Sequence, residues 1–342
     1  MTHPARSALV LQGGGALGAY ELGAARALYK NANFAPDVIA GVSIGAITAV
    51  LLARPVHGLK PLEALEAFWK EVTVSGLFFP PPLRQFASFL GNPHFFVPRL
   101  DYLAWPTWTY FYETAPLRRT LEQLVDLRAL ADTNAHPGLL LSATDLQEGQ
   151  IEYFYSRTKS LALDHIMASG SLPPAFPMTV IEGKSYWDGG LFDNTPLGAV
   201  LDRLDDAPDV ERTVYVVNLF PNKAKIPGNL SEIQARLKNL QFANKTLDDV
   251  EMMRRFNEVA KLVEALDKFP GGNPLKDDPA YAAVKRRAYI HVPRIVSIMP
   301  PDPTDEFGDA DFSPEAIKKR ADDGYAQTMK ALEATVQAAQ SP

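Results

Sequence analysis

The sequence predicts a three-layer α/β/α fold around a mostly parallel central sheet. Short apolar runs of strand length alternate with longer segments of helical spacing, and glycine-rich turns follow the first two runs. In this strand–helix–strand–helix order, neighbouring strands pair in parallel through right-handed crossovers. The chain of 342 residues is long enough for one large domain with additions, and its 46% hydrophobic content is typical of globular proteins.

The first 53 residues contain the repeating unit of this fold. Residues 7–12 (SALVLQ) form a short apolar run before a glycine cluster, which indicates a buried strand. Residues 16–30 carry good helix formers at helical spacing. A second apolar run over 36–41 predicts a second strand, and 44–53 predicts a second helix.

The stretch between Phe68 and Tyr112 fits neither pattern. It holds 14 of the chain's aromatic residues, of which there are 4 Trp, 12 Tyr and 18 Phe in all, together with several prolines. We therefore expect an aromatic-rich cap insertion at about residues 60–115. Either it forms an apolar lid that touches lipid, with Trp105, Trp108 and Tyr110 at the interface, or it is a small cap with its own aromatic core.

The remaining elements complete the sheet and add helices at the C-terminus. Helices are predicted at 61–70, 116–127, 161–168 and 313–339, and strands at 138–145, 151–155, 178–181, 185–187, 213–220 and 289–298. Between Leu230 and Leu266 apolar residues recur every three or four positions. A single helix of that length would span roughly 55 Å, so we expect two helices or one broken helix. We expect a main domain over 1–220 and a helical C-terminal extension over 221–342, with one late strand, packed on the same domain.

Composition excludes several classes of function. The net charge is −6 and no Lys/Arg block stands out, so we expect no nucleic-acid partner and no polybasic grip on lipid. Without cysteine the chain has no disulfide, thiolate metal site or cysteine nucleophile. No His pair has metal-ligand spacing, so we expect no metal and no cofactor. The polar N-terminus and the short apolar run at 8–12 predict a cytoplasmic protein.

Gly41-Val42-Ser43-Ile44-Gly45 is the strongest single motif. It follows a predicted strand and opens a predicted helix, the context that a nucleophile elbow requires. The sharp turn exposes the hydroxyl of Ser43, and the flanking Gly41 and Gly45 avoid steric collision in the turn. The N–H of Ile44, at the start of the helix, is directed toward developing negative charge.

A second glycine loop, Gly13-Gly14-Gly15-Ala16-Leu17-Gly18, also connects a strand to a helix. Its backbone N–H groups can bind an anion, either a phosphate or an oxyanion. Gly13, Gly15 and Gly18 also fit the dinucleotide-binding pattern, but that pattern needs an acidic residue at the end of the second strand. Here Ala40-Gly41 stand there instead. We therefore favour an oxyanion hole made by Gly13, Gly14, Gly15 and the N–H of Ile44, because adjacent parallel strands place both loops at one sheet edge.

A nucleophilic serine needs a base, and Asp188 is the candidate. In Trp187-Asp188-Gly189-Gly190 it leaves a predicted strand and meets two glycines, which places the carboxylate at an open turn. These three motifs, in this order, resemble the patatin-like phospholipase family. The segment from Ala168 to Pro177 and the Asn194-x-Pro196 pair are also similar to that family, so the resemblance covers about residues 8–196.

The resemblance implies a Ser–Asp dyad without histidine, with Ser43 as nucleophile, Asp188 as base, the glycine loop as oxyanion hole, and no metal. The catalytic domain would then be 1–220. One departure is Leu17, where the family often has Arg or Lys, so the role of that cation is open. A rival Ser–Asp–His triad would use His291, which lies within a predicted strand and is more typical of a packed core residue.

The predicted function is hydrolysis of lipid acyl esters through an acyl-serine intermediate. The substrate partner is a lipid or other acyl ester, and we expect any membrane contact to be peripheral. An acyltransferase that uses the same residues and a non-catalytic lipid-binding protein are the two alternatives. The sequence predicts no particular oligomeric state.

Overall fold

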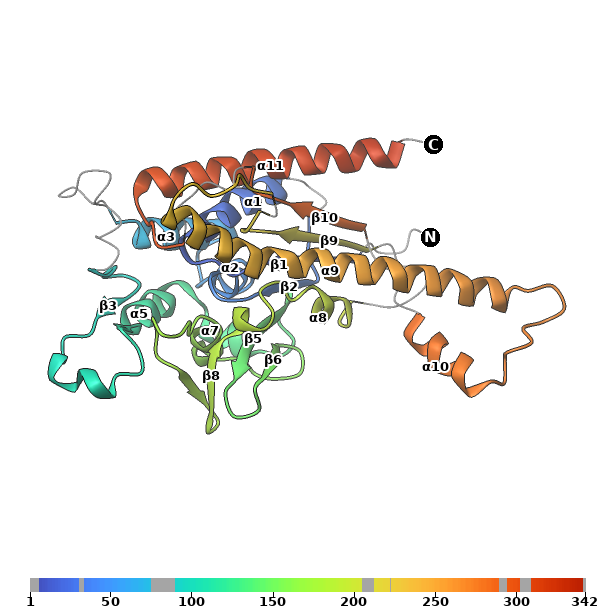
Figure 1. The fold of residues 1–342 in the computed structure, drawn as a ribbon, viewed down its shortest axis with the longest axis horizontal. Helices are drawn as coiled ribbons and strands as arrows, with labels where there is room; N and C mark the ends of the chain where they lie inside the picture. Colours follow the sequence, from blue (N-terminus) through green and yellow to red (C-terminus); the bar gives the residue numbers. More distant parts are fainter. Residues whose placement is uncertain are drawn as a thin grey trace.

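The computed structural model describes residues 6–30, 34–74, 90–204, 212–221, 223–288, 294–301 and 309–340. Its centre is an eight-stranded sheet covered by helices (Figure 1), and the predicted α/β/α class is confirmed. One part of the sheet is parallel, with the order β10-β9-β1-β2-β5. These strands are β1 (Arg6–Leu11), β2 (Val38–Gly41), β5 (Gly138–Asp145), β9 (Arg212–Val217) and β10 (Arg294–Ile298).

The other end of the sheet is antiparallel. It consists of β6 (Gln150–Tyr155), β7 (Thr179–Ile181) and β8 (Lys184–Asp188). β6 pairs with β5, and β7 pairs with β8, each in an antiparallel hairpin. β8 also pairs with β5, and Asp188 lies opposite Ala143. This pairing brings the last residue of β8 beside the end of a parallel strand.

The two faces of the sheet pack against different helices because successive side chains of a strand point to opposite faces. Leu9 and Leu11 of β1 belong to the larger core, and Ala8 and Val10 belong to the smaller one. The larger core lies under α1 (Ala19–Lys30), α2 (Ile44–Ala53), α3 (Pro61–Val72) and α11 (Pro314–Gln340), and the smaller one lies against α8 (Leu197–Leu201).

The aromatic-rich segment packs part of its rings into the body of the protein. Phe95 and Phe96 are buried, and their ring centroids lie 5.4 to 6.5 Å from those of Phe176 and Phe312. Residues 75–89 of the predicted insertion lie outside the described residues. The described elements of the aromatic-rich segment are β3 (Val97–Pro98), η3 (Tyr102–Thr107) and β4 (Tyr112–Glu113). The helices α5 (Ala115–Leu124), α6 (Leu127–Ala131) and α7 (Leu163–Ser169) follow it along the chain.

The prediction of two helices, or a broken one, after residue 230 is wrong. α9 (Leu230–Asp267) is a single helix of 38 residues. It extends beyond the sheet and meets α10 (Pro279–Ala288) at its far end (Figure 1). There the hydroxyl of Tyr281 donates to Asp267 at 2.6 Å, and its ring packs beside Val263. A partner helix outside the main body supports the second half of α9, so α9 need not bend back onto the sheet.

Candidate active site

Ser43 lies in the sharp turn between β2 and α2. Its backbone has φ 55° and ψ −124°. A positive φ in a residue other than glycine costs about 1–3 kcal/mol and is concentrated at functional sites. Ser43 occupies the N-cap position of α2, but its side chain makes no capping hydrogen bond. The hydroxyl is therefore left for another partner.

Hydrogen bonds to the last residue of α7 hold this turn in place. The backbone N–H of Ser43 donates to both the carbonyl oxygen and the hydroxyl oxygen of Ser169, each at 3.1 Å. Ser169 is the last residue of α7 and is fully buried. Two acceptors on a buried residue hold the strained peptide in one orientation.

The glycine loop and the serine turn lie side by side. A Cβ atom added at Gly13 would lie 3.0 Å from the Cβ atom of Ser43 and 2.4 Å from Oδ1 of Asn194. Only a glycine leaves room for this approach. The loop then continues into η1 (Gly15–Gly18) and α1, so the strand-loop-helix order at this edge follows the prediction.

The backbone donors of the loop are not all available. The N–H of Gly13 donates to the carbonyl oxygen of Asn194 at 3.4 Å, while Nδ2 of Asn194 donates to the carbonyl oxygen of Gly13 at 3.1 Å. No described residue accepts a hydrogen bond from the N–H of Gly14, Gly15 or Ile44. These three groups, rather than Gly13, are the free donors of the predicted oxyanion hole.

Asp188 ends β8 at the same edge of the sheet. Its carboxylate Oδ1 accepts from the N–H of Gly190 at 2.7 Å, and its backbone carbonyl accepts from the hydroxyl of Thr144 at 2.8 Å. The side chain of Ser43 lies close enough to the carboxyl group to lower its pKa. The structure therefore brings together the two residues that the sequence predicts as nucleophile and base.

The environment of Asp188 shifts its proton affinity. The residue is only 2% exposed, and burial raises the pKa of its carboxyl group from 3.8 to about 6. This value already includes the contacts with Ser43 and Gly190, which offset part of the effect of burial because they favour the charged form. Above pH 6 the group is mainly a carboxylate, and its pKa lies closer to neutral pH than the pKa of an ordinary aspartate.

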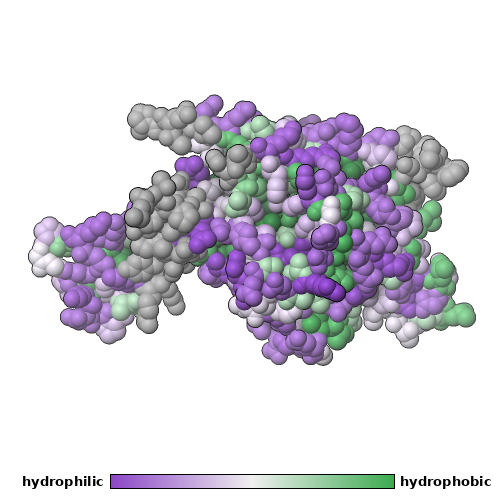
Figure 2. Space-filling view, turned by 180° about the vertical axis from the view of Figure 1, so that it is seen from behind, coloured by the Kyte–Doolittle hydropathy of each residue, from purple (hydrophilic) through white to green (hydrophobic). Residues whose placement is uncertain are grey.

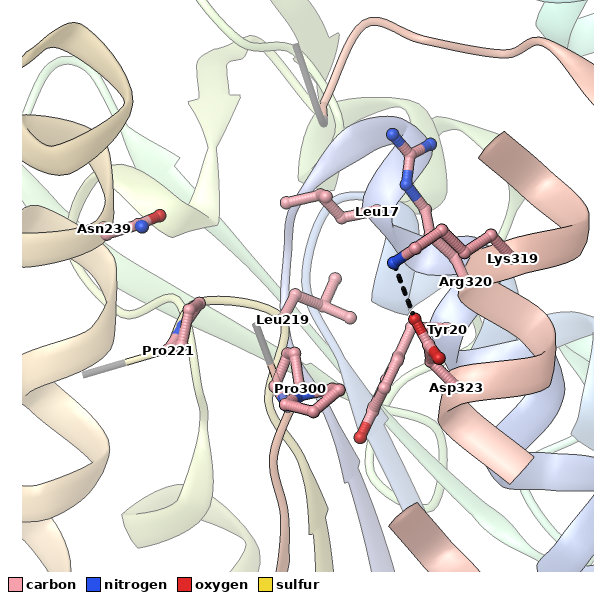
Figure 3. A pocket seen from close by; sticks show the side chains of 10 residues that line it. Leu17, Tyr20, Leu219, Pro221, Asn239, Pro300, Lys319, Arg320 and Asp323 are labelled. Carbon is pink, nitrogen blue, oxygen red and sulfur yellow. Dashed lines mark hydrogen bonds and ion pairs between the residues drawn. The ribbon is translucent and has the colours of Figure 1, made fainter. Parts of the chain in front are cut away.

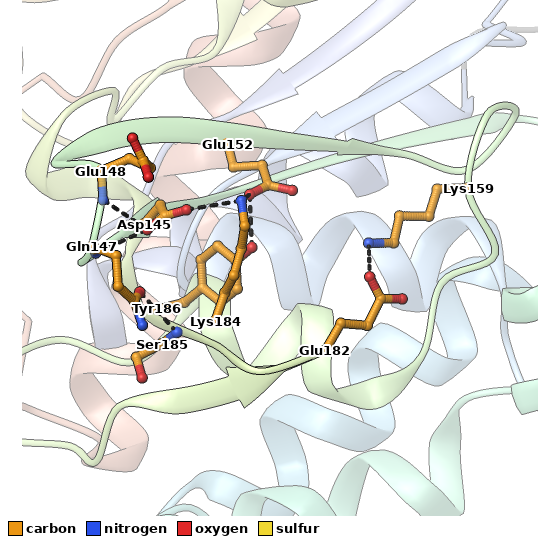
Figure 4. A network of polar contacts seen from close by, with 9 residues as sticks. All are labelled: Asp145, Gln147, Glu148, Glu152, Lys159, Glu182, Lys184, Ser185 and Tyr186. Carbon is orange, nitrogen blue, oxygen red and sulfur yellow. Dashed lines mark hydrogen bonds and ion pairs between the residues drawn. The ribbon is translucent and has the colours of Figure 1, made fainter.

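A polar network holds β8 in its register (Figure 4). Lys184, at the start of β8, forms ion pairs with Asp145 at 3.0 Å and with Glu152 at 3.3 Å. Tyr186 donates to Glu152 at 2.6 Å. The N–H of Glu148 and the ammonium group of Lys184, with a smaller contribution from the N–H of Gln147, lower the pKa of Asp145. Three strands are thus tied together two to four residues from Asp188.

The other motif glycines lie where backbone or side-chain atoms of neighbouring segments approach closely. A Cβ atom on Gly41 would lie 2.1 Å from the carbonyl oxygen of Gly45. The same addition gives 2.5 Å between Gly45 and the Leu11 carbonyl, 2.6 Å between Gly18 and Ile44, 2.6 Å between Gly189 and the Ser142 carbonyl, and 2.7 Å between Gly190 and Asn194. Each distance is too short for a side chain, so these glycines maintain the packing of the edge.

Histidine takes no part in the described site. His291 lies outside the described residues. His165 is in α7, where its ring packs on Phe154 with centroids 4.8 Å apart, and burial lowers its pKa. Within the described ranges no group of three His, Asp or Glu side chains is arranged to hold a metal ion.

Comparison with known proteins identifies the family. A family model described as patatin-like phospholipase matches residues 9–201, and a second, described as patatin phospholipase, matches residues 240–342. The chain belongs to the patatin-like phospholipase family. It is an enzyme of the lipid ester hydrolase class, and the first match covers every motif described above. No curated protein matches the chain.

Several solved structures resemble the chain at low identity. VipD from Legionella pneumophila is 16% identical, with a TM-score of 0.42; the match covers 98% of this chain and 67% of VipD. Two structures of ExoU in complex with SpcU, from the type III secretion system of Pseudomonas aeruginosa, have TM-scores of 0.27 and 0.32 at 15% and 16% identity. Those matches cover 84% and 98% of this chain, and 70% and 59% of the matched chains.

Proposed function

We propose that this patatin-like enzyme hydrolyses lipid acyl esters with Ser43 as nucleophile and Asp188 as the only side-chain base. The observation that carries the proposal is the pairing of a strained, uncapped serine with a buried carboxyl group whose pKa is raised to about 6. A base of this kind accepts the hydroxyl proton more readily than an exposed aspartate does.

The acylation step follows from this pairing. Asp188 accepts the proton of the Ser43 hydroxyl as Oγ attacks the carbonyl carbon of the ester. The tetrahedral oxyanion is bound by the free N–H groups of Gly14, Gly15 and Ile44, and each such donor contributes about 3–4 kcal/mol of transition-state stabilisation. When the intermediate collapses, the C–O bond of the ester breaks and Asp188 returns its proton to the departing alcohol.

Deacylation reverses these roles with water. Asp188 accepts a proton from water as the water oxygen attacks the acyl-serine carbonyl, and the oxyanion occupies the same donors. Collapse breaks the bond between the acyl group and Oγ, and Ser43 takes back the proton from Asp188. The products are a carboxylic acid and an alcohol.

The apolar surface near the site is suited to a lipid interface. Leu100, Tyr102 and Leu103 are exposed by 76%, 65% and 103%, and the segment between β3 and β4 that carries them is hydrophobic at its tip, at the lower right of Figure 2. The N–H of Phe111 donates to the carbonyl oxygens of Pro174 and Ala175, which joins this segment to the turn after α7. None of the described helices is both long and apolar enough to cross a bilayer. We propose a peripheral contact that these side chains make with lipid.

The dyad is tested by turnover of a short chromogenic acyl ester. We expect Ser43→Ala and Asp188→Ala to be inactive while folding normally, and His291→Ala to keep the activity of the wild type. An Asp188→Ala variant within tenfold of wild type, or an inactive but folded His291→Ala, contradicts the dyad. Loss of activity in the double variant Leu100→Ser/Leu103→Ser on lipid vesicles, with unchanged turnover of the soluble ester, tests the peripheral contact.

Two other functions use the same residues. An acyltransferase would transfer the acyl group from Ser43 to an added alcohol, so product analysis with that alcohol distinguishes transfer from hydrolysis. A non-catalytic lipid-binding protein would leave Ser43 unlabelled by a fluorophosphonate. The carboxyl group of Asp188 can accept the proton of Ser43, and this favours a catalytic function over a non-catalytic lipid-binding one.

A further inference from the structure

The far end of the glycine loop is bonded to the C-terminal part of the chain. The N–H of Ala16 donates to the carbonyl oxygen of Asp309 at 3.0 Å. The carbonyl oxygen of Ala16 accepts from Nη1 of Arg320 at 3.2 Å, and the same nitrogen donates to the carbonyl oxygen of Asp311 at 2.7 Å. The N–H and the carbonyl group of Ala16 are therefore both held by residues 309–320, about 300 positions later in the sequence.

Arg320 is a buried cation beside the glycine loop. It is only 6% exposed, and its side chain leaves α11 beside Leu17, at a pocket also lined by Tyr20 and Leu219 (Figure 3). A buried guanidinium is tolerated only when its donors are bonded, so these contacts resist opening. Arg320 therefore brings a positive charge from α11 to the loop that contains Leu17.

The parts that carry Arg320 and Asp309 are themselves fixed. A Cβ atom on Gly23 would lie 1.8 Å from the Ala321 carbonyl oxygen, and one on Gly324 would lie 2.0 Å from the Tyr20 carbonyl oxygen. The backbones of α1 and α11 are thus in direct contact. Asp309 forms an ion pair with Lys238 of α9. We call the contacts of Asp309 and Arg320 with Ala16 the clamp. α11 and α9 support this clamp rigidly.

The clamp acts on the residues that carry the free donors. Gly15 has a φ of 54°, and a Cβ atom there would lie 2.4 Å from the Asp309 carbonyl oxygen. Three consecutive glycines have wide conformational freedom, so the loop needs restraints from outside. Asn194 supplies the restraint at Gly13, and the segment from Asp309 to Arg320 supplies the one at Ala16.

We infer that Arg320 is a positioning residue, which holds the N–H groups of Gly14 and Gly15 where the oxyanion forms. The inference rests on the proposed function of the glycine loop. It gives the C-terminal extension a role in the reaction through the position of the glycine loop. A misplacement of about 1 Å at such a site costs about 100-fold in rate.

The kinetic test compares Arg320→Met, Arg320→Lys and the matched control Lys318→Met. Lys318 lies on the same helix, and its side chain is 78% exposed. Active sites are counted by the end point of fluorophosphonate labelling, so that kcat refers to folded sites only. We expect Arg320→Met to lower kcat by about 10- to 100-fold, with KM and the pH midpoint unchanged. Arg320→Lys should recover part of the rate, and Lys318→Met should match wild type.

A second measurement does not depend on activity. Hydrogen–deuterium exchange of the peptide covering residues 13–18 should be faster in both Arg320 variants, while exchange in α2 stays as in wild type. Unchanged exchange in residues 13–18, or an unchanged kcat per labelled site, overturns the inference. If wild type neither turns over esters nor labels, the proposed function fails, and the exchange result still decides whether Arg320 holds the loop. Should Arg320→Met not fold, Arg320→Lys carries both measurements.

Discussion

Two buried carboxyl groups each lie beside a hydroxyl of the segment from Ser43 to Ala53, and they differ in what they can do. Asp188 faces Ser43 at the start of α2, and Glu21 of α1 lies near Thr48 one turn further along. Burial raises the pKa of both carboxyl groups, to about 6 for Asp188 and well above the usual range for Glu21. By proton affinity alone, either could be taken for a catalytic group.

The difference lies in access and in backbone donors. Thr48 and Glu21 are both fully buried, whereas Ser43 is partly exposed at the sheet edge. Asp188 accepts a backbone N–H from Gly190, while no described residue forms a hydrogen bond of good geometry with either oxygen of Glu21. Free N–H groups for an oxyanion lie beside Ser43 and not beside Thr48. A perturbed pKa therefore marks a candidate site only where a substrate can reach it.

The largest expected effect is on turnover. Asp188→Asn removes the base while keeping the shape, and should lower kcat on a soluble ester by about 10³-fold. The matched change Glu21→Gln should leave kcat within about threefold of wild type, because this carboxyl group touches no reacting atom. Equal losses in the two variants would show that burial, and not the position of Asp188, determines activity.

The second prediction concerns pH. Since the base must be ionised, kcat/KM should rise with pH through about 6 and then level off. The midpoint should be the same in Glu21→Gln as in wild type. A midpoint near 4 in wild type would mean that Asp188 is solvated in the working enzyme, which contradicts its burial.

The third prediction concerns stability: the variant that loses the most activity, Asp188→Asn, should be more stable than wild type. The raised pKa of Asp188 means that folded protein binds its proton more tightly than unfolded protein, so this contribution to stability falls as pH rises from 3.8 to about 6. Asp188→Asn should therefore stabilise the fold at pH 7 by up to about 3 kcal/mol, as measured by urea unfolding. Destabilisation by the same variant at pH 7 would contradict the account.

The smallest effect concerns strain at Ser43. Glycine adopts the positive φ of this position freely, while alanine does not. Ser43→Gly should be more stable than Ser43→Ala by about 1 kcal/mol, after the greater freedom of glycine in the unfolded chain is counted. Thermal unfolding of the two inactive variants measures this difference, and equal midpoints would mean that the turn is relaxed.

Much of this edge of the sheet could be predicted because it follows from local sequence patterns. Each loop follows a short apolar strand and opens a helix, and adjacent parallel strands place their loops together. For this reason Gly13–Gly15, Ser43 and Asp188 could be chosen from sequence, and the structure places them side by side. Which donors are free was not local information, because it depends on the carbonyl group of Asn194.

The C-terminal half shows where sequence reasoning fails. α9 is one helix because α10 supports it outside the main body, and periodicity alone carries no record of that partner. Arg320 is one of four basic residues of α11, and its tertiary contact with Ala16 distinguishes it from the others. Nothing local in the sequence near Arg320 predicts that contact.

The central claim is that the carboxyl group of Asp188 controls the reactivity of Ser43, and the most direct measurement is the rate of fluorophosphonate labelling against pH, with the adduct located by mass spectrometry. We predict a single adduct on Ser43 in wild type, a rate that rises through about pH 6, and a slow, pH-independent rate in Asp188→Asn. An adduct on another residue, or equal labelling rates with and without the carboxyl group, would contradict the account.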